Sequence, residues 1–374
     1  MLFREIKNPI FVYYFDTLMK KILGFFVLLL SLNACDDGDF NIESFDFTTA
    51  STNSCNSGES GFFIYRINDN EALIIQIPEN SFRNEITPPG VPRIINITGT
   101  NKVFYRLYNG SLSANVICNT IPPATPTVST EWNAVSGDIE ISTFVNKQVN
   151  ETTNASEITG YTHTIVLRNV NFDTGNGNQQ LFTELVFGDY VTSSFRQGNY
   201  NINITSCNIA PVGLDPIYDY SYLFKIPTTG PSTPANVPPQ AMTLKIDPNL
   251  FVAEATSENN PPRTDIIDGD LNVLKIIYYG SSISSELLCA NETPTPLEEF
   301  ISEDGVTGIS GIIEVRTTIE YEIPTDNLSP VIGHRHKITL KNVTMTKVVL
   351  PSQLPVSFNL GDVYEFGEFV INLP

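Results

Sequence analysis

Basic residues are scarce in this chain of 374 residues, where 21 Lys and Arg stand against 41 Asp and Glu and the formal net charge at pH 7 is −20. A surface of this sign repels phosphate backbones and anionic headgroups, so it excludes nucleic acid as a partner. Hydrophobic residues make up 41% of the chain, which is enough to bury real cores. We therefore expect folded domains whose acidic surface keeps them soluble outside a cell.

Catalytic motifs are also missing from the sequence. It contains no Gly-x-Ser-x-Gly, no His-Glu-x-x-His and no phosphate-binding loop. Histidine occurs only at positions 163, 334 and 336, which leaves little for general base chemistry. The sequence predicts a protein that is not an enzyme and holds no cofactor. A hydrolase of extracellular polymers is the alternative, because the paired carboxylates of glycosidases meet only in the fold.

A hydrophobic run long enough to cross a membrane is absent too. The apolar run from Ile22 to Leu32 is about half of the roughly 20 residues that a spanning helix needs. Two lysines precede this run and small residues follow it, which is the pattern of a signal peptide. We assign residues 1–34 to that signal peptide, with Met19 as the natural start.

The residues around the expected cleavage site resemble those of bacterial lipoproteins. Leu-Asn-Ala-Cys at 32–35 resembles the lipobox, which implies that Cys35 becomes the fatty-acylated N-terminus. Asp-Asp-Gly-Asp at 36–39 resembles the acidic stretch that directs Bacteroidota lipoproteins to the outer cell surface, although in enterobacterial lipoproteins an Asp beside the cysteine favours the inner membrane. The resemblance implies a chain anchored to the outer membrane by lipid, with residues 35–47 as an acidic tether.

Internal repeats indicate two copies of one domain. Residues 160–170 (GYTHTIVLRNV) match residues 333–343 (GHRHKITLKNV). Weaker matches follow in the same order along the chain: 75–82 with 244–251, 139–141 with 313–315, 187–189 with 360–362, and 198–204 with 367–373. We call residues 48–205 copy one and residues 206–374 copy two, and we expect a fairly rigid tandem because few residues separate them.

The remaining four cysteines fit this duplication. Cys55 corresponds to Cys207 and Cys118 to Cys289, so each copy carries one pair. Four cysteines in an exported chain allow three pairings, and the repeat selects Cys55–Cys118 and Cys207–Cys289. Their wide spacing does not suit a zinc site.

Strand patterns dominate both copies. Around residues 164–168 and 337–341, apolar and polar side chains alternate with the two-residue period of a half-buried strand. Proline-rich clusters punctuate these runs, and 25 prolines leave little room for long helices. The sequence predicts an all-β protein of two tandem antiparallel β-sandwich domains, with a barrel as the alternative architecture.

Two histidines lie one residue apart at the start of a predicted strand. His334 and His336 share a strand face, a spacing that can place two imidazoles on one metal ion. They also share that face with core residues, and copy one repeats only the second histidine, as His163. We therefore expect buried histidines with local hydrogen bonds and no metal site.

Three tyrosines alternate along one predicted strand of copy two. Tyr218, Tyr220 and Tyr222 would form an aromatic stripe able to stack on sugar rings or anchor a protein partner. Packing within the sheet is the plainer explanation for such a stripe. The stripe is the candidate binding site that the sequence offers.

A cluster of carboxylates occupies a proline-flanked loop of copy two. Asp265, Asp268 and Asp270 offer the hard oxygen ligands that calcium prefers. Their spacing is not that of an EF-hand loop, which favours an acidic turn in contact with solvent.

These features predict a lipid-anchored, non-catalytic protein that acts in binding, adhesion or assembly, with a glycan or an outer-membrane protein as partner. A purely structural envelope lipoprotein is a further alternative. A fold alone does not select among these functions.

Overall fold

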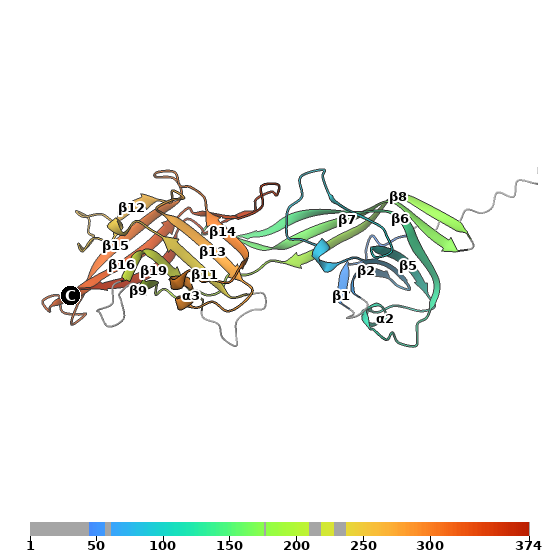
Figure 1. Cartoon of the computed structure of the whole chain (residues 1–374), viewed down its shortest axis with the longest axis horizontal. Coiled ribbons are helices and arrows are strands. Elements are labelled where there is room, and N and C mark those ends of the chain that lie inside the picture. The colour runs from blue at the N-terminus through green and yellow to red at the C-terminus, as the bar shows by residue number, and fades with distance from the viewer. Residues whose placement is uncertain (1–44, 57–60, 176, 209–217, 228–236, 374) are drawn as a thin grey trace, which may run out of the picture. The chain divides into compact units, whose positions relative to one another are not determined.

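A computed structural model describes residues 45–56, 61–175, 177–208, 218–227 and 237–373 of the chain (Figure 1). Residues Phe47–Pro374 form one compact unit, separate from Met1–Asp46. The signal peptide, Cys35 and nearly all of the acidic tether lie outside the described residues. Among the described residues, no helix has the length and apolar character to span a bilayer.

The described part of copy one consists of strands with one short helix and one 3-10 turn. Its strands pair antiparallel in the order β1-β2-β3-β5-β6-β7-β8, and β4 pairs with β6. The elements are β1 (Asn53–Asn56), β2 (Phe62–Asn68), β3 (Glu71–Gln76), η2 (Glu79–Ser81), β4 (Arg93–Asn96), β5 (Lys102–Tyr108), α2 (Ala114–Cys118), β6 (Val128–Val149), β7 (Ser156–Gly175) and β8 (Asn178–Ser193).

Copy two repeats this order with more, shorter strands. It forms one sheet in the order β18-β17-β14-β13-β11-β10-β9 and a second in the order β12-β15-β16-β19. The elements are β9 (Thr205–Asn208), β10 (Tyr218–Lys225), β11 (Gln240–Lys245), η3 (Pro248–Leu250), β12 (Arg263–Ile266), β13 (Val273–Tyr279), α3 (Ser285–Ala290), β14 (Pro296–Ser302), β15 (Ile312–Tyr321), β16 (Val331–Lys341), β17 (Thr344–Lys347), β18 (Ser357–Asn359) and β19 (Tyr364–Asn372).

The two copies share one topology. The first half of β6 pairs with β5 as β14 pairs with β13, and its second half pairs with β4 and β7 as β15 pairs with β12 and β16. In copy one the long strand passes from one sheet to the other through register shifts around Gly137, which has φ 126°. In copy two residues 303–311 interrupt the strand at that point. Each copy is therefore a two-layered antiparallel sandwich, and the predicted all-β fold is confirmed.

The core of copy two lies between its two sheets. Leu244 of β11 and Ile276 of β13 face it from one sheet, and Val315 of β15 and Leu340 of β16 face it from the other. All four side chains are fully buried. Successive side chains of a strand point to opposite faces of the sheet, so the residues on either side of each core residue point away from this core.

The last strand of each copy differs from the sequence-based alignment. The register pairs Ile165 with Gly188 and Ile338 with Gly367, so residues 187–189 correspond to 366–368 and the expected match to 360–362 is wrong. Both glycines have positive φ, of 118° and 146°, a conformation that favours glycine.

The expected match of residues 198–204 with residues 367–373 is wrong as well. Strand β8 ends at Ser193. The segment around Asn203 instead makes a parallel bridge to Glu368 of β19, so residues 198–204 lie beside residues 367–373 and the two segments are not equivalent strands. The two segments resemble each other because each has apolar residues at alternate positions after a glycine.

Candidate binding site

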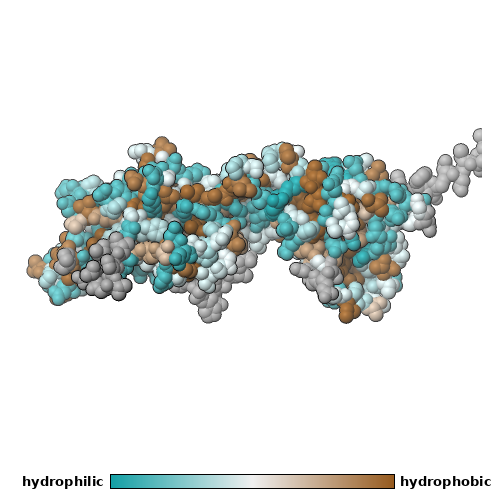
Figure 2. Space-filling view, in the orientation of Figure 1, coloured by the Kyte–Doolittle hydropathy of each residue, from teal (hydrophilic) through white to brown (hydrophobic). Residues whose placement is uncertain are grey.

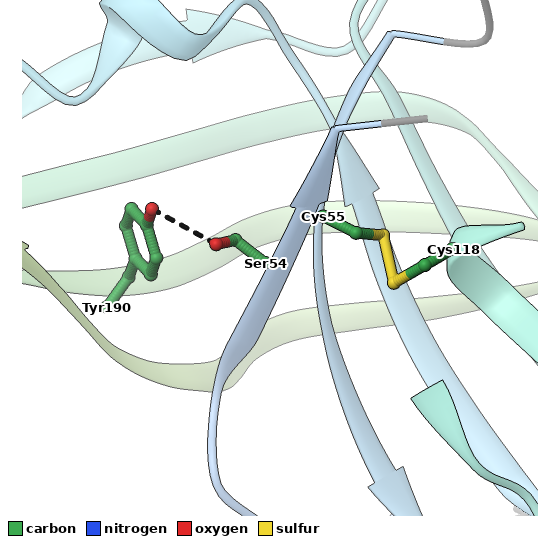
Figure 3. The surroundings of a disulfide bond; sticks show 4 residues. All are labelled: Ser54, Cys55, Cys118 and Tyr190. Carbon is green, nitrogen blue, oxygen red and sulfur yellow. Dashed lines mark hydrogen bonds between the residues drawn. A yellow bond between two sulfur atoms is a disulfide. The ribbon is translucent and has the colours of Figure 1, made fainter. Parts of the chain in front are cut away.

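A disulfide bridge joins the first strand of each copy to its short helix. Cys55 of β1 and Cys118 of α2 have Cα atoms 5.5 Å apart, and Cys207 of β9 and Cys289 of α3 have Cα atoms 5.4 Å apart. Figure 3 shows the first bridge on one side of β1, while the neighbouring Ser54 points to the other side and accepts a hydrogen bond from Tyr190. The structure thus contains the two pairs that the repeat predicts.

Each bridge holds its helix against the outer face of the larger sheet. In copy two, Leu288 of α3 packs with Cys207, Phe224, Ala241 and Tyr279 in a small buried cluster. In copy one, Val116 of α2 packs in the same way against residues of β2, β3 and β5. This outer cluster is distinct from the core between the sheets.

A cavity of about 450 Å³ lies on this outer face of copy two, between the helix and strands β10, β11, β13 and β14. Ligand cavities in proteins commonly enclose roughly 300–1,000 Å³. The lining residues combine aromatic rings, hydroxyls, an amide and two lysines: Tyr222, Thr243, Lys245, Gly269, Asp270, Val273, Lys275, Ile277, Tyr279, Leu288, Asn291, Thr293 and Ile301.

Copy one has a smaller cavity at the equivalent place, with a volume of about 110 Å³. The cross-strand pair Phe63–Gln76 in copy one stands where Tyr222–Lys245 stands in copy two, and all four residues line their cavities. Apolar and uncharged side chains thus replace a tyrosine and a lysine. The position of the cavity is repeated, and its chemistry differs between the copies.

The tyrosines of the larger cavity are held in place by hydrogen bonds. Burial raises the pKa of Tyr222, and a hydrogen bond with Thr243 partly offsets this rise. Burial also raises the pKa of Tyr279, which is hydrogen-bonded to Thr293. Both phenols are therefore neutral near pH 7 and present a ring together with a hydroxyl.

The two lysines of the cavity already have partners. Lys275 forms an ion pair with Glu299 at 2.8 Å between Nζ and Oε1. Lys245 donates to the backbone carbonyl of Asp270 at 2.6 Å. Lys245 Nζ also lies 3.9 Å from the Asp270 carboxylate, so each lysine has a carboxylate partner and the cavity suits a neutral polar ligand better than a strongly anionic one.

The structure separates the tyrosines of the expected stripe. The side chain of Tyr218 lies outside the described part of the chain. Tyr220 stacks on Phe369 with ring centroids 5.0 Å apart and contributes to the core between the sheets, whereas Tyr222 lines the cavity on the outer face. A register shift between Asp219 and Leu223 explains why two residues of equal parity reach opposite faces.

The histidines form a repeated buried contact. His163 Nδ1 lies 2.9 Å from Thr143 Oγ1, and His336 Nδ1 lies 2.9 Å from Thr317 Oγ1. Both imidazoles are buried, whereas His334 is half-exposed. Within the described ranges, no group of three or more His, Cys, Asp or Glu side chains could hold a metal ion.

The carboxylates of the acidic loop stabilise the loop itself. Asp268 Oδ1 accepts hydrogen bonds from the backbone N–H groups of Asn272 and Asp270 at 2.9 and 3.0 Å. The bond from Asn272 is the main reason that the pKa of Asp268 is lowered. Asp265 accepts a bond from the Asn272 amide, and Asp270 lies at the rim of the cavity.

Several cavity residues were not identified from the sequence. The outer face of β13 carries three of them at alternate positions: Lys275, Ile277 and Tyr279. The two-residue period of a strand could have grouped these three residues from the sequence. The contribution of Thr243 from β11 depends on strand pairing. Comparison of the chain with protein-family models, with curated proteins and with solved structures found no match.

Proposed function

We propose that this chain is a non-catalytic binding protein, anchored by lipid to a bacterial outer membrane, and that the cavity of copy two is its ligand site. The observation that carries the proposal is the recurrence of a cavity at the same place in both copies, beneath a helix held by a disulfide. The larger volume and more polar lining in copy two favour that copy as the functional one.

The lining of this cavity fits a neutral glycan. A sugar presents an apolar ring face together with hydroxyls, and an aromatic ring beside hydrogen-bonding groups can bind both. Tyr222 offers such a ring, and Thr243, Asn291 and Thr293 offer hydroxyl and amide groups in the same cavity. We therefore propose an oligosaccharide as the ligand class.

The anchor rests on the sequence and is consistent with the cysteine geometry. Disulfides form and persist in exported proteins, and both cysteine pairs have disulfide geometry. A Cys35→Ser variant expressed in a bacterium should lose incorporation of labelled palmitate and remain uncleaved, whereas the wild-type chain should be labelled. An unlabelled, uncut wild-type chain would contradict the anchor. Protease treatment of intact cells then tests exposure at the cell surface.

A glycan array probed with the full chain in detergent tests the ligand class. A Tyr222→Ala variant should bind the recognised glycan roughly 30-fold more weakly, a loss of about 2 kcal/mol in binding free energy. Losses of this size are typical when a central aromatic contact of a binding site is removed. Phe63→Ala, at the matching position of copy one, is the control and should bind as the wild type does. Equal binding by the Tyr222→Ala variant would place the ligand elsewhere, and silence across the array would reject the glycan.

A further inference from the structure

The tip of copy one is docked onto copy two. The turn between β6 and β7, residues 150–155, approaches the end of β18. Asn154 Nδ2 donates to both carboxylate oxygens of Asp362 at 3.0 and 3.1 Å, and the backbone N–H of Asp362 donates to the Thr153 carbonyl at 2.8 Å. The backbone N–H of Asn359 donates to Ser156 Oγ at 2.8 Å.

Apolar side chains bury the rest of this contact. Ile158 and Tyr161 of β7 are 5% and 1% exposed, and they belong to the same buried cluster as Phe300 and Phe358 of copy two. Strand β7 therefore completes the core of the second copy. Such a contact orders the tandem, since it combines buried apolar area with several hydrogen bonds.

This internal contact joins two different surfaces of a repeated domain. The tip of the β6–β7 hairpin belongs to one end of the sandwich, and the surface that receives it belongs to β18. Contacts of this head-to-tail kind join two different surfaces, so they can propagate from molecule to molecule into rings or filaments. The duplication places an equivalent tip on copy two and an equivalent receiving surface on copy one.

The equivalent tip of copy two exposes apolar side chains. It is the turn at residues 322–330 between β15 and β16, where Leu328 is 91% exposed and Ile323 is also exposed. Val331 stands at the position of the docked Ile158, and its neighbour Ile332 is exposed as well. Four large apolar residues at one tip are unusual for a surface that meets only water.

The equivalent receiving surface of copy one also exposes a large apolar side chain. The register pairs Asn171 with Leu181 in copy one and Thr344 with Asn359 in copy two, so Leu181 of β8 stands where the docked Asn359 stands. Leu181 is 59% exposed. Figure 2 shows apolar residues among hydrophilic ones over the viewed face, so exposure alone does not mark an interface. The interface is inferred from the equivalence of these surfaces to the two that meet within the chain.

We infer that the chain associates head to tail with a second copy of itself, the β15–β16 tip of one molecule docking on the β7–β8 surface of the next. The two surfaces match the pair that is already joined within the chain. The net charge of −20 opposes this association, and it acts through charges that salt screens. Association should therefore strengthen as the ionic strength rises.

Directed cross-linking of the full chain tests this arrangement. One tagged form carries Leu328→Cys and a differently tagged form carries Leu181→Cys, and both are expressed together and treated with a short bismaleimide. A heterodimer that contains both tags is expected. The control pairs Leu328→Cys with Leu297→Cys, an exposed leucine of β14. A heterodimer yield no greater than that of the control pair would overturn the inference.

A second measurement does not depend on cysteine placement. Sedimentation velocity of the full chain in detergent should show species larger than one chain, with a shift to larger species at higher salt. Leu328→Asp should shift the distribution to single chains and leave the circular dichroism spectrum unchanged, because the side chain is exposed. A wild-type chain that stays single at every concentration and salt would overturn the inference.

Discussion

Mild acid should destabilise both copies through two buried histidines. Burial lowers the pKa of His163 from 6.5 to about 4, and the positive charge of Arg93 adds to this effect. Burial likewise lowers the pKa of His336 to about 4, with smaller effects of His334 and Arg263. Because these folded-state pKa values lie below the unfolded value, the unfolded chain binds more protons between about pH 6.5 and 4. The free energy of unfolding therefore falls as the pH falls through that window.

The size of the effect follows from these pKa values. A shift from 6.5 to about 4 corresponds to about 3 kcal/mol for each histidine over the whole window. Between pH 7 and pH 5.5 the same relation gives a loss of about 1.2 kcal/mol for each histidine. Carboxylates with lowered pKa values, such as Glu314, lose their contribution only below their ordinary value of 4.5. The range from pH 7 to 5.5 therefore isolates the histidines.

Urea unfolding at pH 7 and pH 5.5 measures this loss, with fluorescence of the single tryptophan, the buried Trp132, as the probe. Because the two copies form one compact unit, the wild type should lose about 2.4 kcal/mol between the two pH values. His163→Gln cannot be protonated and keeps an amide near Thr143, so it should halve the loss. His336→Gln should do the same, and the double variant should lose almost nothing. A double variant as sensitive to pH as the wild type would refute the reasoning.

Two further substitutions test the fold. Replacing Cys207 and Cys289 together by alanine should lower the free energy of unfolding by about 4 kcal/mol in urea titrations, since their bridge closes a loop of 82 residues; an unchanged midpoint would contradict this role. Gly188→Ala should destabilise copy one by more than about 1 kcal/mol, because φ is 118° and the new Cβ would lie 2.7 Å from Arg66 Nη1. Gly175→Ala is its control, with φ at 93° and no heavy atom within 4 Å of the new Cβ. If both variants lose the same free energy of unfolding, backbone strain explains the whole effect and the contact with Arg66 contributes nothing.

The fold was predictable because its signals are short in range or repeated. Alternation of apolar and polar residues gives strands, and the correspondence of Cys55 to Cys207 and of Cys118 to Cys289 in the repeat gives the cysteine pairing. The last strand was misaligned because residues 187–189 resemble both 360–362 and 366–368. Only the pairing of β8 with β7 and of β19 with β16 distinguishes the two matches.

The binding site was only partly predictable from the sequence. Tyr222 was identified as part of an aromatic stripe, and the structure places it in the cavity of copy two. Its separation from Tyr220 depends on a register shift within β10, which alternation of residue types does not reveal. Thr243, Lys275 and Tyr279 come from neighbouring strands, so their meeting with Tyr222 depends on sheet order.

The contribution of Ile158 and Tyr161 to the core of copy two also has an evolutionary consequence. After a duplication, either half of the gene can be lost without harm to the other. A domain whose core includes side chains of its neighbour no longer folds well by itself. A deletion that removes residues 48–193 would uncover apolar surface on the remainder. The two copies are therefore inherited together. Later substitutions in the β6–β7 hairpin of copy one are constrained by the core of copy two, which this hairpin contacts.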